Sequence, residues 1–166
     1  MKLDSNISDR YNFAAVFENH GWIIDPSKYL QELFTHYTAL GGKFDKSEVS
    51  NIQSQSILLN DDISITADKI VIATGAWSNF LAKKLKLVPK IESERGYHIE
   101  LINPSHMPTQ ALKVDSGKFI VTPMLGRIRL AGISEFGGLS LGPSKAPIDL
   151  LKKHVKTLFP KMKYDR

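Results

Sequence analysis

The residues that could bind a ligand or do chemistry fall in three short stretches of the chain. In the first, DKIVIATGAWSNFL at residues 68–81, an apolar run from Ile70 to Ala73 leads to Gly75. Such a run is typical of a buried strand. Glycine occurs where the backbone needs a positive φ, or where another group approaches the main chain closely. Gly75 therefore marks either a ligand contact or simply the end of a strand.

The second stretch, RGYH at residues 95–98, opens a predicted strand. Alternation places Tyr97 and Ile99 on one face and His98 and Glu100 on the other, so only one pair can face a cavity. His98 is a candidate functional residue, although a lone histidine in a strand also serves as a structural polar residue.

The third stretch, residues 119–132, carries Arg127 and Arg129 in a predicted strand pair with a tight turn. The alternative for both is a simple surface position.

Several classes of chemistry lack their sequence signatures. The chain has no cysteine, and its five histidines show no metal-ligand spacing, so we expect no metal site. Neither a G-x-S-x-G elbow nor a Walker-type lysine loop occurs. No G-x-G-x-x-G follows a strand, although a chain that binds a dinucleotide alone would usually need that phosphate turn. No catalytic acid or base is identifiable.

Composition predicts an ordinary globular protein. The 166 residues are 42% hydrophobic and 23% charged, enough for a working core. No apolar run approaches the roughly 20 residues that cross a bilayer, and the polar N-terminus lacks a signal-peptide core. We expect a soluble intracellular protein with no transmembrane segment, cytoplasmic or peripheral to the inner membrane.

The net charge of +5 belongs to the C-terminal tail. Residues 145–166 hold seven Lys or Arg against two Asp, whereas residues 1–144 balance at fifteen against fifteen. The tail is Lys-rich on the predicted outer face of a helix, which favours a solvated surface over a phosphate or nucleic-acid site. Binding to nucleic acid is therefore not expected.

The elements predicted to position these residues are three helices among strands. Asp25-Pro26 begins a helix that runs to about Leu40, because Asp is a good N-cap and Pro suits the first helical position. A short helix follows Trp77, and a third runs from about Pro147 to Pro160. Besides 70–73, the predicted strands are 14–17, 49–53, 56–59, 63–66, 96–102, 118–123 and 127–133. Short turns between strands favour an α+β fold with a mixed, largely antiparallel sheet flanked by helices.

The order of these segments resembles a known family. HGWIIDPSKYLQELFTHYTALGGKF, then Val49, then ITADKIVIATGAWSNFLAKKLKL and PKIESERGYHIEL are similar to segments of the FAD-dependent amine and amino-acid oxidoreductases. This family includes D-amino acid dehydrogenase, D-amino acid oxidase, glycine oxidase and sarcosine oxidase. The resemblance spans roughly residues 14–160.

The resemblance implies that FAD is the cofactor of the intact enzyme, held weakly or not at all by this chain alone. Backbone N–H groups in a bare turn can face an anionic phosphate without obstruction. Val49 would lie beside the adenine through its main chain. The implied cofactor-binding residues are Val49, Ala73, Thr74, Gly75, Ala76 and Trp77.

The resemblance also implies a substrate site. In several of these oxidases a basic residue follows the proline of the third stretch and pairs with the substrate carboxylate, a bidentate role suited to Arg. Met124 stands there in this chain, so Arg127 or Arg129 would have to substitute. The implied substrate-binding residues are Tyr97, His98, Arg127 and Arg129.

Family members begin with a glycine-rich phosphate loop and end with another flavin-binding segment, and neither occurs in this sequence. We therefore expect one truncated unit. Residues 14–80 would lead to the flavin-contacting strand, and residues 91–160 would form the substrate-binding sheet and helix.

The implied reaction is oxidation of a D-amino acid or related amine to an imine, which hydrolyses to an oxo acid. The implied partners are the small-molecule substrate and a complementary chain that carries the rest of the flavin domain. Two alternatives stay open: a non-catalytic remnant or isolated substrate-binding domain, and a phosphate- or nucleic-acid-binding module that uses the Lys-rich tail.

Overall fold

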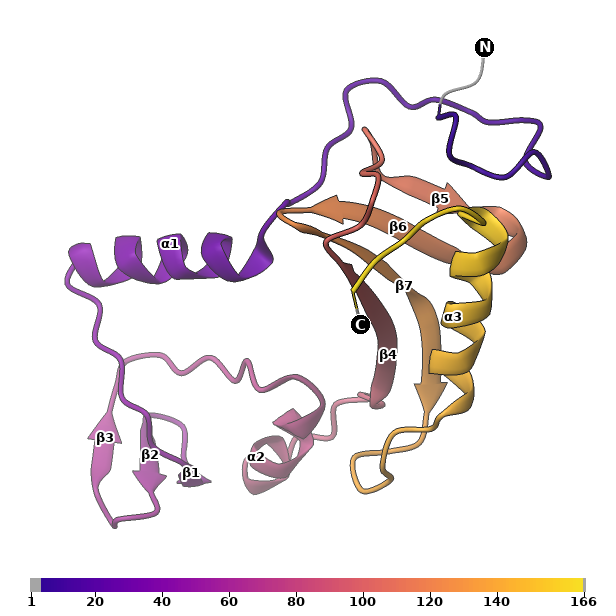
Figure 1. Cartoon of the computed structure of the whole chain (residues 1–166). Helices are drawn as coiled ribbons and strands as arrows, with labels where there is room; N and C mark the ends of the chain where they lie inside the picture. The colour runs from indigo at the N-terminus through magenta and orange to yellow at the C-terminus, as the bar shows by residue number, and fades with distance from the viewer. Residues whose placement is uncertain (1–3, 166) are drawn as a thin grey trace. The chain divides into compact units, whose positions relative to one another are not determined.

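The computed structural model describes residues 4–165 and divides the chain into two compact units (Figure 1). The four-stranded unit comprises Met1–Thr35, Arg95–Glu135 and Gly142–Arg166. The three-stranded unit comprises His36–Glu94 and Phe136–Leu141. The expectation of one truncated unit, with residues 14–80 leading to the flavin-contacting strand and residues 91–160 forming the substrate-binding part, stays a prediction.

The four-stranded unit is built on a sheet with the strand order β4-β7-β6-β5. β5 pairs with β6 and β6 with β7 in antiparallel fashion. β4 and β7 also run in opposite directions, because Asn103 N–H bonds Gly126 O at one end while Arg95 lies 3.6 Å from Glu135 at the other. The strands are β4 (Glu94–Ile102), β5 (Leu112–Val114), β6 (Phe119–Met124) and β7 (Arg127–Phe136), with a 3-10 turn at Asp115–Gly117.

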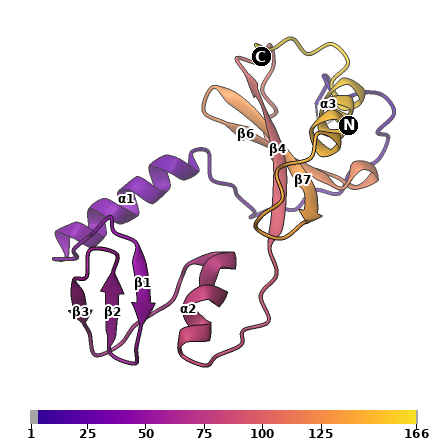
Figure 2. The same ribbon diagram turned by 90° about the horizontal axis from the view of Figure 1, so that it is seen from below.

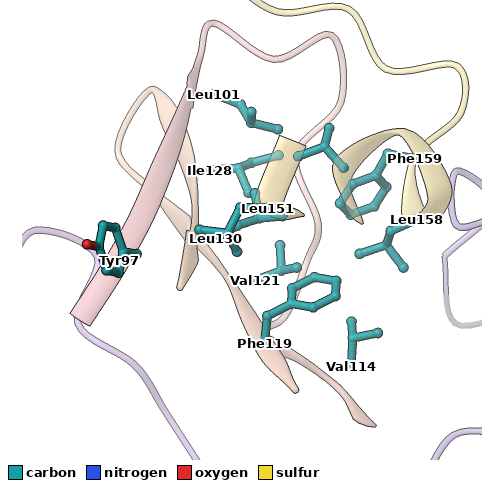
Figure 3. Packing of buried hydrophobic residues seen from close by; sticks show 11 residues of the cluster. Tyr97, Leu101, Val114, Phe119, Val121, Ile128, Leu130, Leu151, Leu158 and Phe159 are labelled. Carbon is teal, nitrogen blue, oxygen red and sulfur yellow. The ribbon is translucent and has the colours of Figure 1, made fainter. Parts of the chain in front are cut away.

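Helix α3 (Ala146–Leu158) covers one face of this sheet. In Figure 3, Leu151 and Leu158 of α3, together with Phe159 directly after the helix, lie against Phe119 and Val121 of β6. The helix lies this way because its apolar residues recur on one side, whereas Lys152, Lys153 and Lys156 are exposed, as the sequence predicted. The core contains Tyr97, Leu101, Val114, Phe119, Val121, Ile128, Leu130, Leu151, Val155, Leu158 and Phe159.

The side chains of β7 switch from one face of the sheet to the other at Gly132. Before it, Ile128 and Leu130 point to the core; after it, the odd-numbered Ile133 packs against the same core. The glycine has φ +146°, and a Cβ there would come within 2.5 Å of the Lys118 carbonyl oxygen. The reversal therefore needs a residue without a side chain.

The three-stranded unit has a small antiparallel sheet in the order β1-β2-β3, seen side by side in Figure 2. Its strands are β1 (Val49–Ile52), β2 (Ser56–Leu59) and β3 (Ser64–Thr66). Helix α2 (Ser78–Lys84) packs against β1, and a 3-10 turn, Gly75–Trp77, precedes it. The buried apolar residues of this unit are Ile52, Leu59, Leu81 and Ala82.

Helix α1 (Pro26–Ala39) begins as the sequence predicted: the Lys28 N–H donates to Asp25 Oδ1 at 3.0 Å, which makes Asp25 its cap. None of its residues is buried among the described residues. Its apolar side chains are exposed instead, among them Tyr29, Leu30 and Leu33.

The α+β fold with antiparallel sheets and flanking helices is confirmed, and the predicted helices and most predicted strands are present. Two strand predictions are wrong. Residues 14–17 and Ile70–Ala73 belong to no strand, because neither segment lies beside another strand with which it could bond among the described residues. The sequence also missed β5, whose three residues are too few to show a periodicity.

Candidate functional site

The predicted cofactor residues all lie in the three-stranded unit. Residues 70–74 are extended or irregular, and the chain turns at Gly75, which has φ +55°. A Cβ at Gly75 would meet nothing within 4 Å, so the described chain does not crowd this glycine. What requires glycine is the left-handed backbone conformation. The turn leaves open space directly beside an exposed main chain.

Polar side chains close the turn. The Trp77 N–H donates to Thr74 O at 3.2 Å, and the hydroxyls of Thr74 and Ser78 lie 3.1 Å apart. Ser78 is buried, whereas the Trp77 ring is 65% exposed. Residues 73–77 thus form a compact turn that directs a large aromatic side chain outward.

Val49 lies at the first position of β1, beside a bulge. Val49 pairs with Leu59 and Asn51 with Leu58, so Ser50 is an extra residue in the strand. Its hydroxyl donates to the carbonyl oxygens of Leu58 and Leu59, at 3.1 and 3.3 Å. Because α2 packs against β1, the structure brings the strand that starts at Val49 against the helix that follows residues 73–77.

The predicted substrate residues lie on the four-stranded sheet, on opposite faces. Tyr97 is 6% exposed and belongs to the core face. Its hydroxyl donates to Glu135 and accepts a hydrogen bond of 2.7 Å from the Ser144 N–H. The Tyr97 ring therefore serves the core and its hydroxyl is already bonded, so Tyr97 is not brought together with the other three.

Glu135 is the centre of this polar cluster. It accepts hydrogen bonds from the Ser144 and Tyr97 hydroxyls and lies 3.6 Å from the Arg95 guanidinium. The hydrogen bonds from Ser144 and Tyr97, with the positive charge of Arg95, lower the pKa of the Glu135 carboxyl. Arg95 also donates to Gly142 O at 2.8 Å. The cluster fastens the segment before α3 to the sheet.

The opposite face, which α3 does not cover, carries His98, Arg127 and Arg129. We call it the open face. His98 is exposed, and the Arg127 Nε–H donates to Glu100 Oε1 at 3.1 Å. Arg129 faces Thr122 across the strand pair. Its Nε is buried with no hydrogen-bond partner among the described residues.

A further segment, residues 22–24, contacts the end of β6 and the turn that follows it. The Trp22 indole N–H donates to Pro123 O at 2.8 Å, and the Leu125 N–H donates to Ile24 O at 3.2 Å. Met124, between them, is 6% exposed. Met124, the residue after Pro123, is thus a packed apolar side chain. No periodic signal links residues about a hundred positions apart, so the sequence could not show this contact.

The described residues lack two other features. Among residues 4–165, His, Asp and Glu nowhere gather in a group of three that could hold a metal ion. Over the same range, none of the helices has the length and apolar character needed to span a membrane.

Comparison with known proteins decides the family. The family profile described as FAD dependent oxidoreductase matches residues 2–166. The chain belongs to this family. FAD is therefore the cofactor expected of the intact enzyme.

Relatives within this FAD-dependent family carry names of amino-acid-oxidising enzymes. The chain is 28% identical over 166 residues to a D-amino-acid oxidase of Bradyrhizobium diazoefficiens. This match covers 98% of this chain and 39% of the relative. It is 23% identical over 154 residues to a D-amino acid dehydrogenase of Rhizobium rhizogenes, covering 84% and 37%. The chain thus spans about two fifths of the length of these relatives.

Solved structures confirm the fold. An iminodiacetate oxidase from Chelativorans sp. BNC1 superposes with a TM-score of 0.67 at 16% identity, covering 83% of this chain and 40% of that one. A glycine oxidase from Geobacillus kaustophilus superposes with a TM-score of 0.61 at 18% identity, covering 74% and 35%.

The residues present fit part of a FAD site. The turn at Gly75 offers exposed main chain beside open space, which suits close approach of a cofactor. The glycine-rich turn that would hold the pyrophosphate is absent from the sequence. The exposed turn at Gly75 is thus the feature of the described residues that fits a cofactor.

Proposed function

We propose that the chain is part of a FAD-dependent oxidoreductase that oxidises a D-amino acid or a related amine to the imine, which water hydrolyses to the oxo acid. The observation that carries the proposal is the family match over residues 2–166. Relatives named D-amino-acid oxidase and D-amino acid dehydrogenase favour this substrate class.

Bound FAD would supply the hydride acceptor for this reaction. In this proposal the protein's part is to hold the substrate and to exclude water. His98, Arg127 and Arg129 on the open face of the sheet are the candidates to orient it. Tyr97 lies on the other face of the sheet. Its hydroxyl connects β4 to β7 through Glu135, and to the segment before α3 through Ser144.

The cofactor contacts would come from the other unit. We assign them to the main chain at Val49 and to residues 73–77: Ala73, Thr74, Gly75, Ala76 and Trp77. The segment before this turn supports the assignment. Residues 70–73 are apolar but belong to no sheet among the described residues, and Val71 is 86% exposed. A β-branched segment of this kind is suited to join a sheet. We propose that the flavin domain of the intact enzyme provides that sheet, within the same polypeptide or in a complementary chain.

A flavin spectrum tests the proposal directly. The purified chain is mixed with FAD, with and without a complementary polypeptide that carries the glycine-rich and C-terminal flavin-binding segments of a relative. We expect weak or no retention of FAD by the chain alone. The complemented sample should retain yellow flavin, which bleaches anaerobically on addition of a D-amino acid but not of its L-enantiomer. Retained flavin that no amino acid or amine reduces would contradict the proposed reaction.

A second candidate is an isolated substrate-binding domain without redox activity. The observation that favours it is that the main core cluster lies wholly within the four-stranded unit, which also carries the predicted substrate residues. It predicts a colourless protein whose melting temperature rises with an amino acid but not with FAD, even beside the complementary polypeptide.

The exposed lysines of α3 support a third candidate, a phosphate- or nucleic-acid-binding surface. It predicts an affinity that falls steeply with salt. Binding to an oligonucleotide measured over a series of salt concentrations separates it from the other two.

A further inference from the structure

Strand β4 forms one edge of the four-stranded sheet, and its only strand neighbour among the described residues is β7. We call the side of β4 that faces away from β7 its outer edge. The Asn103 N–H donates to Gly126 O, on the β7 side. The Ile102 carbonyl faces the other way and accepts from the Asp165 N–H at 2.8 Å. Because the backbone groups of successive residues alternate between the two sides of a strand, the even-numbered residues of β4 carry the N–H and C=O groups of the outer edge.

The C-terminal tail, residues 161–165, already occupies one end of this edge, as Figure 1 shows in yellow. Asp165 forms an antiparallel bridge with Ile102. Just beyond the end of β4, the Ser105 N–H donates to Lys163 O at 2.8 Å, and the Lys163 N–H donates to Ser105 Oγ at 3.0 Å. The tail therefore runs antiparallel to β4 and is held there by main-chain and side-chain hydrogen bonds.

The tail also has the side-chain pattern of a half-buried strand. Met162 and Tyr164 pack against the core cluster. The alternate residues, Lys161, Lys163 and Asp165, are exposed. A period of two with one apolar face is typical of a strand that lies at the side of a sheet and covers its core.

The rest of the outer edge is open to the same kind of pairing. A strand that continued the line of the tail would pass Glu100, His98 and then Gly96, whose backbone groups face outward. It would also extend the core, because Ile99 packs against the core cluster but is only half-buried. A long edge strand whose outward N–H and C=O groups meet no neighbouring strand is a template for strand addition.

A second copy of the chain fits this edge poorly. Because the tail covers Ile102, the longest pairing of two such edges around a two-fold axis runs over residues 94–100. That register places Glu94 directly opposite Glu100 at both ends of the pair. Like charges directly opposite each other destabilise a strand pair, so the sequence of β4 disfavours its pairing with itself.

We propose that the outer edge of β4 binds an extended strand of the polypeptide that completes the enzyme, antiparallel to β4 and in line with the tail. The inference rests on the proposed function, in which this chain is part of a larger oxidoreductase; the matched relatives are more than twice as long as the chain. Main-chain hydrogen bonds to the even-numbered residues supply the recognition. Alternate apolar side chains of the added strand lie beside Tyr97 and Ile99 and extend the core.

Hydrogen exchange of the full chain, measured residue by residue by nuclear magnetic resonance without FAD, tests the proposal. In the chain alone, the amides of Tyr97 and Ile99 face β7 and should exchange slowly, whereas those of Gly96, His98 and Glu100 should exchange fast. The 15N-labelled chain is then mixed with an unlabelled polypeptide that carries the glycine-rich and C-terminal flavin-binding segments of a relative. We expect exchange at the three outer amides to slow roughly tenfold or more, because their N–H groups gain acceptors.

Two substitutions at Gly96 separate strand addition from other contacts with the polypeptide. G96P removes one outward N–H and places the proline ring on the outer edge, while the bonds to β7 stay. It should keep slow exchange in β6 and β7 but weaken binding of the polypeptide roughly tenfold or more. G96A keeps the N–H, its Cβ meets nothing within 4 Å, and it should change the affinity less than about twofold. E100P replaces G96P if that variant does not fold.

The proposal is overturned if the outer amides exchange as slowly as those of Tyr97 and Ile99 in the dilute chain alone, or if the bound polypeptide leaves them fast. Slowing that rises with chain concentration, without the polypeptide, would assign the edge to a second copy instead. Equal binding of the polypeptide by G96P and G96A also overturns it. The proposed oxidation fails separately: flavin that D-amino acids reduce while the outer amides stay fast keeps that function and removes strand addition, and slow outer amides beside unreduced flavin do the opposite.

Discussion

Glu135 joins three parts of the four-stranded unit through one carboxylate. Tyr97 comes from β4, Ser144 from the segment before α3, and Glu135 itself from β7 after the reversal at Gly132. The two hydroxyls donate to the carboxylate, so the ionised form is the one the fold stabilises. The face reversal at Gly132 makes this possible, because without it the odd-numbered Glu135 would point away from Tyr97.

We predict that E135Q lowers stability at neutral pH and weakens its acid dependence. The folded-state pKa of Glu135 lies below its ordinary value of 4.5, so its contribution is present above that pH and is lost as the pH falls through the folded-state value. Urea unfolding midpoints measured between pH 7 and pH 3 check this. E32Q, an exposed position on α1, is the control. Parallel pH profiles for E135Q and the unsubstituted chain would contradict it.

Gly132 should tolerate no side chain. In G132A the new Cβ would lie 2.5 Å from the Lys118 carbonyl oxygen and 2.6 Å from the Phe119 Cα, at a φ that L-residues rarely adopt. We expect a loss of about 3 kcal/mol or more in the free energy of unfolding, or failure to fold. G96A, in β4 of the same sheet with nothing within 4 Å, should cost less than about 1 kcal/mol. Equal stability of the two variants would show that the backbone conformation assigned to Gly132 is wrong.

At the scale of elements, local signals predicted the helices well. The Asp25-Pro26 start is a property of adjacent residues, so it can be read before any packing is known. Whether Ile70–Ala73 pairs as a strand depends instead on what lies beside it, and the described chain offers no partner strand.

In the candidate site, too, local features could be predicted from the sequence, whereas contacts between distant residues could not. Alternation correctly separated Tyr97 from His98, because faces follow from strand geometry alone. The sequence could not show that Glu135, 38 residues away, holds the Tyr97 hydroxyl. Nor could it show that Glu100 pairs with Arg127, or that the Arg129 Nε lacks a hydrogen-bond partner among residues 4–165, because such contacts depend on register and side-chain reach.

The cap of α1 can be tested on its own. D25A removes the acceptor for the Lys28 N–H and should reduce the helical content of α1, at a cost of about 0.5–2 kcal/mol in helix stability. D25N retains an acceptor oxygen and should keep most of the helical content of α1. Amide exchange at residues 28–30 reports the change. A helix that frays equally in D25N and D25A would show that charge near the N-terminus, rather than the cap, stabilises it.

At the scale of the whole molecule, the two units hold very different amounts of buried apolar surface. The four-stranded unit contains the whole main core cluster, with nine side chains that are almost fully buried. The three-stranded unit buries Ile52, Leu59, Leu81 and Ala82. Because burial of apolar surface is the main favourable term in folding, the two units should differ in stability.

We predict that the units open separately in hydrogen exchange, with β1–β3 exchanging faster than β6 and β7. L130A, which truncates a fully buried side chain of β7, should cost about 2–5 kcal/mol and accelerate exchange in β6, β7 and α3. Exchange in β1–β3 should stay as it is. I52A is the matched truncation in the three-stranded unit. It should accelerate exchange in β1–β3 and leave exchange in β6, β7 and α3 unchanged. If either variant accelerates exchange equally throughout residues 4–165, the chain unfolds as one cooperative body, and the cores of the two units depend on each other.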